Sequence, residues 1–582
     1  MGQSGDDLFL GINLYVDPAV ALVRQGKVLA FSEEERHSMN KHAVGTYPAR
    51  ALRYCLNAAG ARIEDVAHVA INWNIPAYSN GEMQAFYRTL REQQSLDAGT
   101  IAWQERTLRT YASAAYEESH HVEWRRLFGP RAFPRLHSIP HHFTHAFQAF
   151  MQSPFDEAIC LTLDGSGDQH CTVVWHCRGS EVKPLREILI PDSLGWFYAA
   201  FTEYLGFRAY DDEYKVMGLA AYGRRRPALQ DAIGQVLHVS SDGTSYEVES
   251  RYIHNGPHAY SGRFTDHLIA LLGRPPRSQD EELTEWHRDL AFAVQEALEI
   301  AVSRLARWAM DVTGIRKLCV GGGIGQNIKM NSRLFLMEGV DDVFPHPLCG
   351  DSGAAAGAAL AACFQFEGHR PEPLTTLALG PEESSSDIET ALRLAHLRYE
   401  RPPDICDAVA DELARGRIVG WFQGRMEAGP RALGQRSILA DPRSAEQRDK
   451  VNAVIKFRED WRPFCPSITA EAMDRYFDRY TEAPFMIVAF PARPTMAQDA
   501  PAVVHVDGTV RVQMVRREAN PRYHRLIEAF GHRTGVPVVL NTSFNVKGEP
   551  IVCTITDALR TFWSTGLETL AVGDYLIRKP AL

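Results

Sequence analysis

The chain has 582 residues, of which 45% are hydrophobic, 10% aromatic and 23% charged, and its net charge is −10. This length predicts two or more domains of an ordinary globular protein. The sequence has no long basic run, which speaks against a nucleic-acid partner, and no apolar stretch of roughly 18–20 residues that would cross a membrane.

The N-terminal residues lack the basic start and apolar core of a secretory signal, so we expect a cytoplasmic protein. The ten cysteines form no CxxC pair, and several lie in apolar runs such as "AICLTLD" (158–164). We therefore expect buried, reduced thiols rather than a zinc ribbon or a disulfide framework.

The first part of the chain has the pattern of three strands followed by a helix. The expected strands are "LFLGINL" (8–14), "AVALVRQ" (19–25) and "VLAFSEEER" (28–36), separated by turn residues. The segment "PARALRYCLNAAG" (48–60) predicts an amphipathic helix, because Leu52, Cys55 and Leu56 share one face.

The same order recurs further along the chain. A strand at 158–164 leads through a "GSGD" turn to a second strand at 169–177, and "KLCV" (317–320) runs into the glycine-rich turn "GGGIGQN". Two separated hairpins of this kind predict a duplicated α/β unit. Long helical patterns lie at 283–314 and in the small-residue segment 351–366.

Composition changes at 367–387, which is rich in Pro, Ser and Glu and predicts a linker. The region after it begins with the pattern of a helix, a Gly turn and a strand. It is dense in arginine: Arg425, Arg431, Arg436, Arg443, Arg458, Arg462 and Arg511.

Two histidines and two aspartates form a candidate metal site. His141 and His145 in "PHHFTHAF" are one helical turn apart, so both imidazoles project from one helix face. Asp164 ends an apolar strand, where ligands collect in α/β folds. Asp351 opens a Gly/Ala-rich helix, for which the alternative is a helix N-cap. An N₂O₂ set of this kind suits iron, manganese or zinc better than calcium.

Eight stretches, in order along residues 9–578, resemble the NodU/CmcH carbamoyltransferases, which include antibiotic O-carbamoyltransferases. They are "HHFTHAFQAF", "LTLDGSGD", "SLGWFYAAFTEYLGF", "EYKVMGLAAYG", "GDSGAAAGAA", "GRMEAGPRALGQRSILADPR", "NAVIKFREDWRPFCPS" and "VVLNTSFNVKGEPIV". The resemblance implies an actin-like ATPase domain (a duplicated ribonuclease H-like unit) with the metal site at 1–368. It further implies a linker at 369–390 and an α/β domain resembling threonylcarbamoyl-AMP synthase at 391–582.

The activity that the resemblance implies is ATP-dependent carbamoyl transfer. The C-terminal domain would make carbamoyl adenylate from carbamoyl phosphate and ATP, and the N-terminal domain would pass the carbamoyl group to a hydroxyl of a small molecule. Iron would occupy the metal site, with manganese or zinc as alternatives, Mg²⁺ could accompany ATP, and the protein would be a homodimer.

Guanidinium and ammonium groups suit the packing of two polyanionic substrates, because they pair with phosphate oxygens. By resemblance, carbamoyl phosphate and ATP are held by Arg431, Lys456, Arg462, Arg511, Asn541 and Ser543. The resemblance also places four residues near the adenylate: Lys41, Gly322, Gly323 and Asn327.

The sequence departs from the family after the first strand. Most relatives read "HDAS" there, and that histidine is the expected general base, whereas this chain reads "YVDPAV" with Val16 at the histidine position. Valine cannot move a proton. His42 and Asp17 are the candidate catalytic residues by their proximity in sequence.

Three alternatives stay open. The acceptor could be an amine, which attacks an acyl adenylate without first losing a proton. The chain could be a non-catalytic nucleotide-binding relative, for which Val16 is the support. The hydrogenase-maturation carbamoyltransferases are a further alternative, disfavoured because this chain has no CxxC pair.

Overall fold

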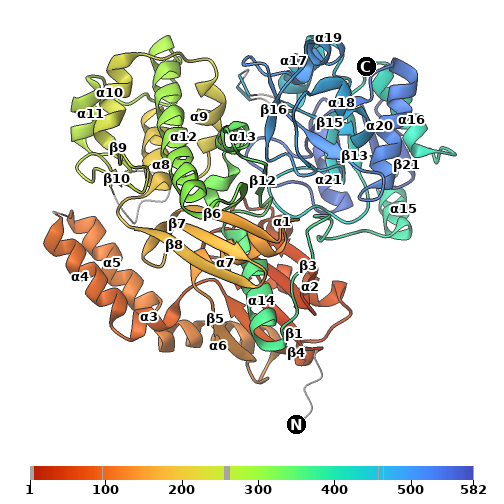
Figure 1. The fold of residues 1–582 in the computed structure, drawn as a ribbon. Helices are drawn as coiled ribbons and strands as arrows, with labels where there is room; N and C mark the ends of the chain where they lie inside the picture. Colours follow the sequence, from red (N-terminus) through yellow and green to blue (C-terminus); the bar gives the residue numbers. More distant parts are fainter. Residues whose placement is uncertain are drawn as a thin grey trace. The chain divides into compact units, whose positions relative to one another are not determined.

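The computed structural model describes residues 6–94, 96–254, 262–456, 458–459, 461–462 and 464–580 (Figure 1). The chain divides into two compact units. The first is built from Met1–Asn13, Leu22–Lys27 and Ala61–Pro373, and the second from Leu14–Ala21, Val28–Gly60 and Leu374–Leu582. The boundary after Pro373 falls within the expected linker. The sequence did not indicate that 14–21 and 28–60 belong with the C-terminal residues.

Two five-stranded sheets with matching strand orders organise the N-terminal part, β3-β2-β1-β4-β5 and β12-β11-β6-β7-β8. The strands of the first are β1 (Leu8–Asn13), β2 (Ala19–Arg24), β3 (Lys27–Glu33), β4 (Val66–Ile71) and β5 (Arg135–Ser138). Those of the second are β6 (Glu157–Gly167), β7 (His170–Arg178), β8 (Glu181–Leu189), β11 (Lys317–Gly321) and β12 (Asp342–Pro345). Strand β1 pairs in parallel with β4 as β6 does with β11, and the outer pairs β4–β5 and β11–β12 are also parallel. The predicted duplication is confirmed, and this is the actin-like ATPase fold.

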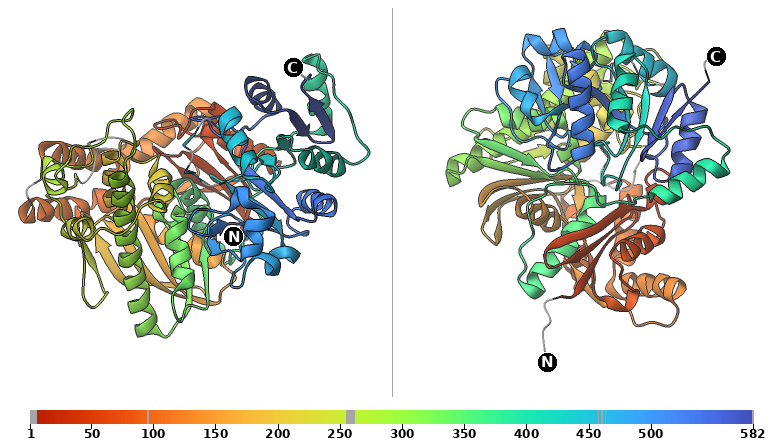
Figure 2. Two further views of the ribbon diagram at one scale, coloured as in Figure 1. Left: turned by 90° about the horizontal axis from the view of Figure 1, so that it is seen from above. Right: turned by 90° about the vertical axis from the view of Figure 1, so that its right-hand side faces the viewer.

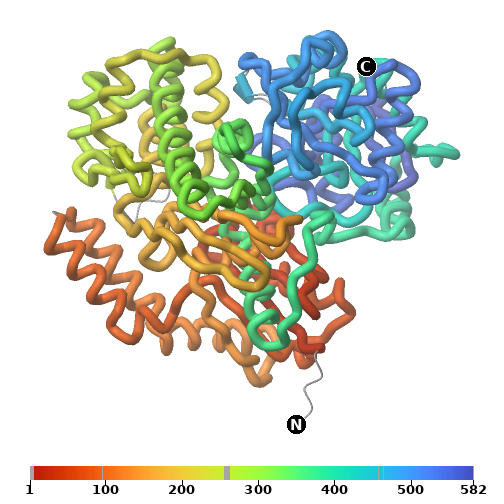
Figure 3. Tube along the Cα trace, viewed as in Figure 1, coloured from red at the N-terminus to blue at the C-terminus, as the bar shows by residue number. Residues whose placement is uncertain are grey.

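Two buried helices pack between these elements. Helix α14 (Asp351–Glu367) packs on β1 and β4, helix α7 (His141–Met151) packs on β6 and β11, and the two helices pack on each other (Figures 2 and 3). The small residues of α14 permit this closeness. A Cβ on Gly11 of β1 would lie 1.8 Å from Ala355 O, and one on Gly357 would lie 2.7 Å from Thr144 O. Close approach therefore explains the run of Gly and Ala.

The remaining helices of the first unit form two groups. Helices α8 (Leu194–Tyr204), α9 (Glu213–Ala220) and α10 (Pro227–Val236) pack on α12 (Glu285–Thr313), with α11 (Asp266–Leu272) against α10. The pattern at 283–314 is thus one helix, which ends as predicted where Gly314 adopts a φ of 76°. The other group comprises α3 (Ile75–Ser79), α4 (Glu82–Gln93), α5 (Ala98–Thr110) and α6 (Ser113–Phe128), and a small sheet joins β9 (Leu237–Val239) to β10 (Tyr246–Val248).

The second unit is built on a seven-stranded mixed sheet, ordered β18-β15-β19-β14-β13-β20-β21. Its strands are β13 (Val419–Phe422), β14 (Arg436–Ala440), β15 (Cys465–Thr469), β18 (Gln513–Val515), β19 (Val538–Ser543), β20 (Thr569–Val572) and β21 (Tyr575–Arg578). Helices α16 (Ile405–Ala414) and α20 (Pro521–Thr534) pack together, and their apolar residues share one core with Trp421 and Leu439. The expected α/β architecture is confirmed, while the likeness to threonylcarbamoyl-AMP synthase stays a prediction.

Smaller elements complete the second unit. They are α1 (Glu34–Ser38), α2 (Ala49–Ala58), α15 (Ser385–Leu394), α17 (Ala445–Val451), a π-helical turn (Asn452–Lys456), α18 (Met473–Tyr476), α19 (Pro494–Asp499), α21 (Ile555–Ser564) and the strand pair β16 (Ala489–Pro491) and β17 (Thr509–Arg511). Helix α15 begins inside the segment expected as a linker.

Two local predictions were wrong. The strand predicted over 28–36 ends at Glu33 and continues as α1, whose first turn carries Glu34 and Glu35, where the helix dipole favours acidic groups. The turn predicted at "GSGD" comes later, because β6 extends to Gly167 and the chain reverses at Asp168 with a φ of 54°.

Two other predictions concern the cysteines and membrane-spanning helices. All ten cysteines are buried and none forms a disulfide, as predicted. In the described ranges we find no helix whose length and apolar character would let it cross a bilayer.

Candidate functional site

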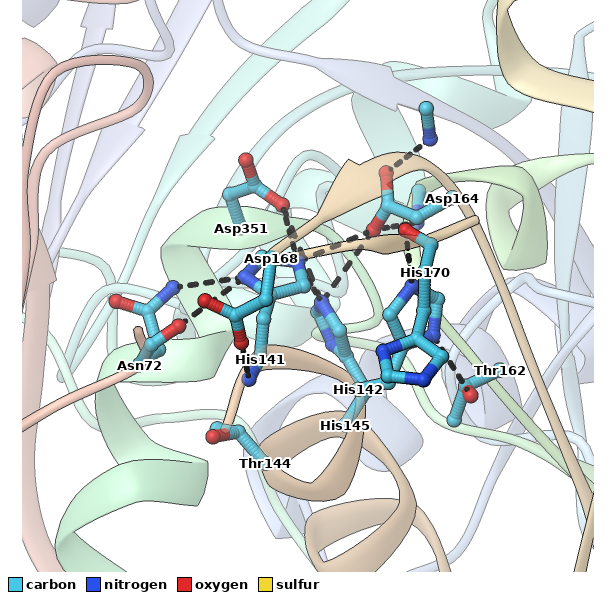
Figure 4. Close-up of polar contacts among 12 residues, drawn as sticks. Asn72, His141, His142, Thr144, His145, Thr162, Asp164, Asp168, His170 and Asp351 are labelled. Carbon is cyan, nitrogen blue, oxygen red and sulfur yellow. Dashed lines mark hydrogen bonds and ion pairs between the residues drawn. The ribbon is translucent and has the colours of Figure 1, made fainter. Parts of the chain in front are cut away.

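Four side chains of the first unit converge from three elements (Figure 4). His141 and His145 come from α7, Asp164 from β6, and Asp351 is the first residue of α14. The two Nε2 atoms lie 3.1 Å apart. Each lies between 3.4 and 3.9 Å from Asp164 Oδ2 and Asp351 Oδ1. The structure therefore brings together all four residues that the sequence proposed as metal ligands.

Asp168 fixes the first turn of α7. Its carboxylate accepts the backbone N–H of His141 at 3.0 Å and that of Asn74 at 2.9 Å. The His141 Nδ1 donates to the carbonyl of Asn72 at 3.2 Å, which turns Nε2 toward Asp164. A Cβ on Gly167 would lie only 2.2 Å from Cδ2 of His141, so the ring occupies the space that a larger residue at 167 would fill.

The third histidine of the motif does not join the cluster. His142 contacts Thr162 Oγ1 through Nδ1 at 2.9 Å and the His170 carbonyl through Nε2 at 3.2 Å (Figure 4). Only the i, i+4 pair of this motif thus faces the two aspartates, and His142 links α7 to the second sheet.

Asp164 is held by backbone groups of two turns. Its Oδ1 accepts the N–H of Gly165 at 2.7 Å, and its Oδ2 accepts the N–H of Gly323 at 3.1 Å. Asp351 does not cap α14, since Gly350 is the N-cap and no side-chain cap bond forms there. The N-cap interpretation of Asp351 is therefore wrong, and its carboxylate faces the two histidines instead.

The pKa values of His141, His145 and Asp164 are shifted from their usual ranges. Burial disfavours the imidazolium of His141, but hydrogen bonding to Asp164 and the charges of Asp351 and Asp164 raise its pKa to about 9. Burial lowers the pKa of His145, and hydrogen bonding to Asp164 offsets this only in part. Although burial opposes ionisation of Asp164, its hydrogen bonds with His141 and His145 hold its pKa well below the usual range.

These residues fit a divalent metal ion. Two imidazole nitrogens and two carboxylate oxygens face one point, and the bond from His141 Nδ1 to a backbone carbonyl is the outer-shell contact typical of a ligating histidine. A cation at this point would replace the proton that His141 otherwise carries.

In the second unit, Asp17 and His42 form a hydrogen-bonded pair. Asp17 Oδ1 lies 2.6 Å from His42 Nδ1. Both residues have positive φ, 48° and 63°, an uncommon conformation for side chains other than Gly. The backbone N–H of His42 donates to Glu35 Oε2 at 2.8 Å, and Lys41 precedes His42 in the same loop. A carboxylate at Nδ1 favours the tautomer in which that nitrogen carries the hydrogen.

The predicted phosphate-binding residues lie near the end of β19. Asn541 Nδ2 donates to the Ala432 carbonyl at 3.2 Å, next to Arg431. Lys456 Nζ donates to the Ser543 carbonyl at 2.6 Å. Arg511 Nε lies 2.6 Å from the Sγ of Cys465, which is paired with Asn541 across the sheet.

Several of these groups are engaged by protein atoms. Burial, followed by the charges of Arg458 and Arg462, lowers the pKa of Lys456 far below its usual range. The Lys456 ammonium additionally contacts Asn545, and Asn541 Nδ2 also contacts Ser467 and Gln513. We therefore expect Lys456 and Asn541 to shape this region as well as to meet a ligand.

The glycine-rich turn at 321–327 contacts the candidate metal site, because the Gly323 N–H donates to Asp164. Gly322 has a φ of 82°, and a Cβ there would lie 2.2 Å from Leu163 O, so the turn needs Gly to pass over β6. Asn327 caps α13 (Ile328–Leu336) by accepting the Met330 N–H at 3.0 Å, and its carboxamide makes two 2.9 Å bonds with Gln295. A role of these residues in nucleotide binding stays a prediction.

Sequence reasoning missed the residues that support the site. Asn72 directly follows β4, and Asp168 directly follows β6, four positions after Asp164 in "DGSGD". Polar residues at the ends of neighbouring strands were the available signal. Glu35 and Arg36 gave no such signal, because a charged run is usually a solvated surface.

Two family models and several known proteins match most of the chain. The model of the Carbamoyltransferase N-terminus matches residues 9–360, and that of the Carbamoyltransferase C-terminus matches 410–579. An uncharacterized protein of Synechocystis sp. is 36% identical over 98% of this chain and 97% of its own length. Nodulation protein NolNO of Sinorhizobium fredii is 37% identical, over 97% of this chain and 79% of its own.

A more distant relative has a chemically informative name. The 3′-hydroxymethylcephem-O-carbamoyltransferase of Amycolatopsis lactamdurans is 30% identical over 80% of this chain and 85% of its own. Because one family model spans more than half of the sequence and close relatives cover nearly all of it, the chain belongs to the carbamoyltransferase family and is a carbamoyltransferase.

Proposed function

We propose that the protein is an ATP-dependent O-carbamoyltransferase, which makes carbamoyl adenylate and transfers its carbamoyl group to a hydroxyl of a small molecule. The observation that carries the proposal is the convergence of His141, His145, Asp164 and Asp351 on one point. The name of the Amycolatopsis relative supports a hydroxyl acceptor.

Activation consumes two polyanions. Carbamoyl phosphate and water give carbamate and phosphate, and a carbamate oxygen then attacks the α-phosphorus of ATP, releasing pyrophosphate. Cationic groups lower the repulsion between these substrates. We assign this step to the set around β19, comprising Arg431, Lys456, Arg462, Arg511, Asn541 and Ser543, with Mg²⁺ accompanying ATP.

We assign the candidate metal site to the transfer step. His141, His145, Asp164 and Asp351 would hold iron, or manganese or zinc in its place. When bound, such an ion supplies Lewis acidity for a carbonyl or phosphate oxygen. The protein's own contribution is orientation: Asn72 turns His141, and the N–H groups of Gly165 and Gly323 direct the Asp164 carboxylate. We assign Gly322, Gly323, Asn327 and Lys41 to the adenylate.

Proton removal from the acceptor falls to the Asp17–His42 pair in this proposal. His42 Nε2 takes the hydroxyl proton, the acceptor oxygen bonds to the carbamoyl carbon, and the bond from that carbon to the AMP oxygen breaks. Asp17 holds Nδ1–H and stabilises the imidazolium that forms. This assignment supplies a base in a chain that has Val16 at the position where the family resemblance implies a histidine.

The second candidate is carbamoylation of an amine, which Val16 favours, since a neutral amine attacks without a base. An acceptor screen scored by the mass increase of one carbamoyl group distinguishes oxygen from nitrogen products after fragmentation.

The homodimer that we also propose is tested by light scattering during gel filtration.

The decisive experiment measures pyrophosphate from ATP with and without carbamoyl phosphate, in the absence of any acceptor. We expect release that depends on carbamoyl phosphate and is accompanied by an equal amount of inorganic phosphate. ATP hydrolysis that ignores carbamoyl phosphate, or no turnover of either compound, would refute the proposal.

A further inference from the structure

Helix α1 carries charged residues that are buried in the second unit. Arg36 is 4% exposed and Glu33, just before the helix, is 5% exposed. Glu35 is also largely covered, with 15% of its side chain exposed. Burying such charges is costly unless each is paired and hydrogen-bonded. The contacts of these three residues, which we call the Glu33–Arg36 bridge, therefore indicate what they are for.

One side of the bridge holds the turn at 429–431. Arg36 Nη2 donates to the Gly429 carbonyl at 2.7 Å, and the Gly429 N–H donates to Glu33 Oε1 at 2.8 Å. Both backbone groups of Gly429 are thus engaged by α1 and the residue before it. Gly429 has a φ of 86°, and Arg431 of the proposed activation set follows two residues later.

The other side of the bridge holds the Asp17–His42 pair. Arg36 Nη1 lies 3.3 Å from Glu35 Oε1, and Glu35 Oε2 accepts the backbone N–H of His42 at 2.8 Å. His42 Nδ1 then meets Asp17 Oδ1 at 2.6 Å. A continuous series of contacts therefore runs from the 429–431 turn through Arg36 and Glu35 to the pair, entirely within one unit.

Only a guanidinium can make this connection. Its planar fork donates to the Gly429 carbonyl and at the same time lies within ion-pairing distance of Glu33, at 3.6 Å, and of Glu35, at 3.3 Å. An ammonium in the same place has one compact donor centre and cannot span the turn and Glu35 together.

We propose that Arg36, with Glu33 and Glu35, is a positioning residue that holds the 429–431 turn and the Asp17–His42 pair in one fixed arrangement. The groups that activate the carbamate and the group that deprotonates the acceptor thus depend on a single side chain. This inference rests on the proposed function of both groups.

The test uses four variants of the full chain and two readouts. The first readout is the KM for carbamoyl phosphate in acceptor-independent pyrophosphate release. The second is the rate at which diethyl pyrocarbonate modifies His42, followed by peptide mass spectrometry, which needs no acceptor. Arg36→Lys should change both readouts, because misplacing a reacting group by about 1 Å lowers the reaction rate by up to about 10²-fold. We expect a KM at least about tenfold higher and a several-fold faster modification of His42.

The other variants separate the two sides. Glu35→Ala should change the His42 readout alone. Glu35→Gln retains an oxygen acceptor for the His42 N–H, so the rate of His42 modification should return toward that of the parent. Glu34→Gln is the matched control, since Glu34 is a buried neighbour that accepts the N–H groups of Arg50 and Ala51 at 3.0 Å and lies outside the bridge.

The outcomes discriminate between the two proposals. An active parent whose Arg36→Lys variant changes only one readout, or changes no more than Glu34→Gln does, overturns this inference alone. A parent that releases no pyrophosphate with carbamoyl phosphate refutes the proposed function, and this inference falls with it.

Discussion

Substituting Gly167 by alanine tests the candidate metal site without changing any proposed ligand. A Cβ at this position would lie 2.2 Å from Cδ2 and 2.5 Å from Cγ of His141, whereas ordinary contact begins near 3.4 Å. The ring must therefore move by roughly 1.2 Å, or β6 must move by as much. Gly167 does not have positive φ, so the backbone accepts alanine and the perturbation acts through the ring.

A ring displacement of this size exceeds what a metal site tolerates. Ligand distances in such sites are held within about 0.2 Å, and losing the correct orientation of a ligand costs about 10–100-fold in affinity. We expect Gly167→Ala to lose metal affinity by at least that factor. Overpacking in a buried region should also lower the free energy of unfolding by about 1–3 kcal/mol.

The assay titrates the chelator-treated protein with ferrous, manganese and zinc ions and records affinity and melting temperature. Gly234→Ala is the matched control, because a Cβ there meets nothing within 4 Å and the site lies in α10. Alanine in a helix is favoured over glycine by about 1 kcal/mol, so this variant should be as stable as the parent or more so. Gly167→Ala that binds every ion with parental affinity would show that His141 is not positioned for a metal.

Further predictions concern the base, the metal and pH. Asp17→Asn should slow transfer by about 10²–10⁴-fold while pyrophosphate release persists, which paired assays of the two steps will show. Chelation of the parent should likewise stop transfer and spare pyrophosphate release, and restored transfer on adding one of the three ions would identify the metal. Val16→His should change the transfer rate, and a rate that neither rises nor falls would remove support for a base or an acceptor that differs from that of the relatives. Burial raises the pKa of Glu213 to about 7, against the lowering effect of the Tyr210 N–H. Because this folded-state pKa exceeds the ordinary 4.5, the contribution of Glu213 to stability is complete below pH 4.5 and is lost as pH rises through about 7. The melting temperature of the parent should fall over that range more than that of Glu213→Gln.

Helix and strand geometry made part of the site predictable from the sequence. His141 and His145 had to share a face because they are one turn apart, and the apolar run before Asp164 placed that residue on a strand, although β6 continues past it to Gly167. The duplicated unit followed from two hairpins with the same apolar pattern. What no local pattern predicts is the contact between the Asn72 carbonyl and His141, because it joins residues that are 69 positions apart in the sequence.

Residues 14–60 illustrate the opposite case. Their strands and helices are largely where the pattern predicts, yet most of the segment belongs with the C-terminal residues. Local periodicity reports which face of an element is buried but carries no information on its partner. The same is true of Arg36, whose burial depends on Gly429, which is 393 positions away along the chain.

Backbone strain provides an argument about whether this chain is catalytic. Of the ten non-glycine residues with positive φ in the described ranges, five fall within 15–17 and 39–43, on either side of the Asp17–His42 contact. Each such conformation costs of order 1–3 kcal/mol and persists only where the surroundings enforce it. Here they include the Gly45 N–H, which donates to the Tyr15 carbonyl at 2.8 Å, and the Glu35 carboxylate, which holds the His42 N–H. A relative that only binds nucleotide has no use for a strained carboxylate–imidazole pair, and relaxation of these loops would stabilise it. The strain retained around this contact therefore supports the proposal that the chain is catalytic and that His42 acts as its base.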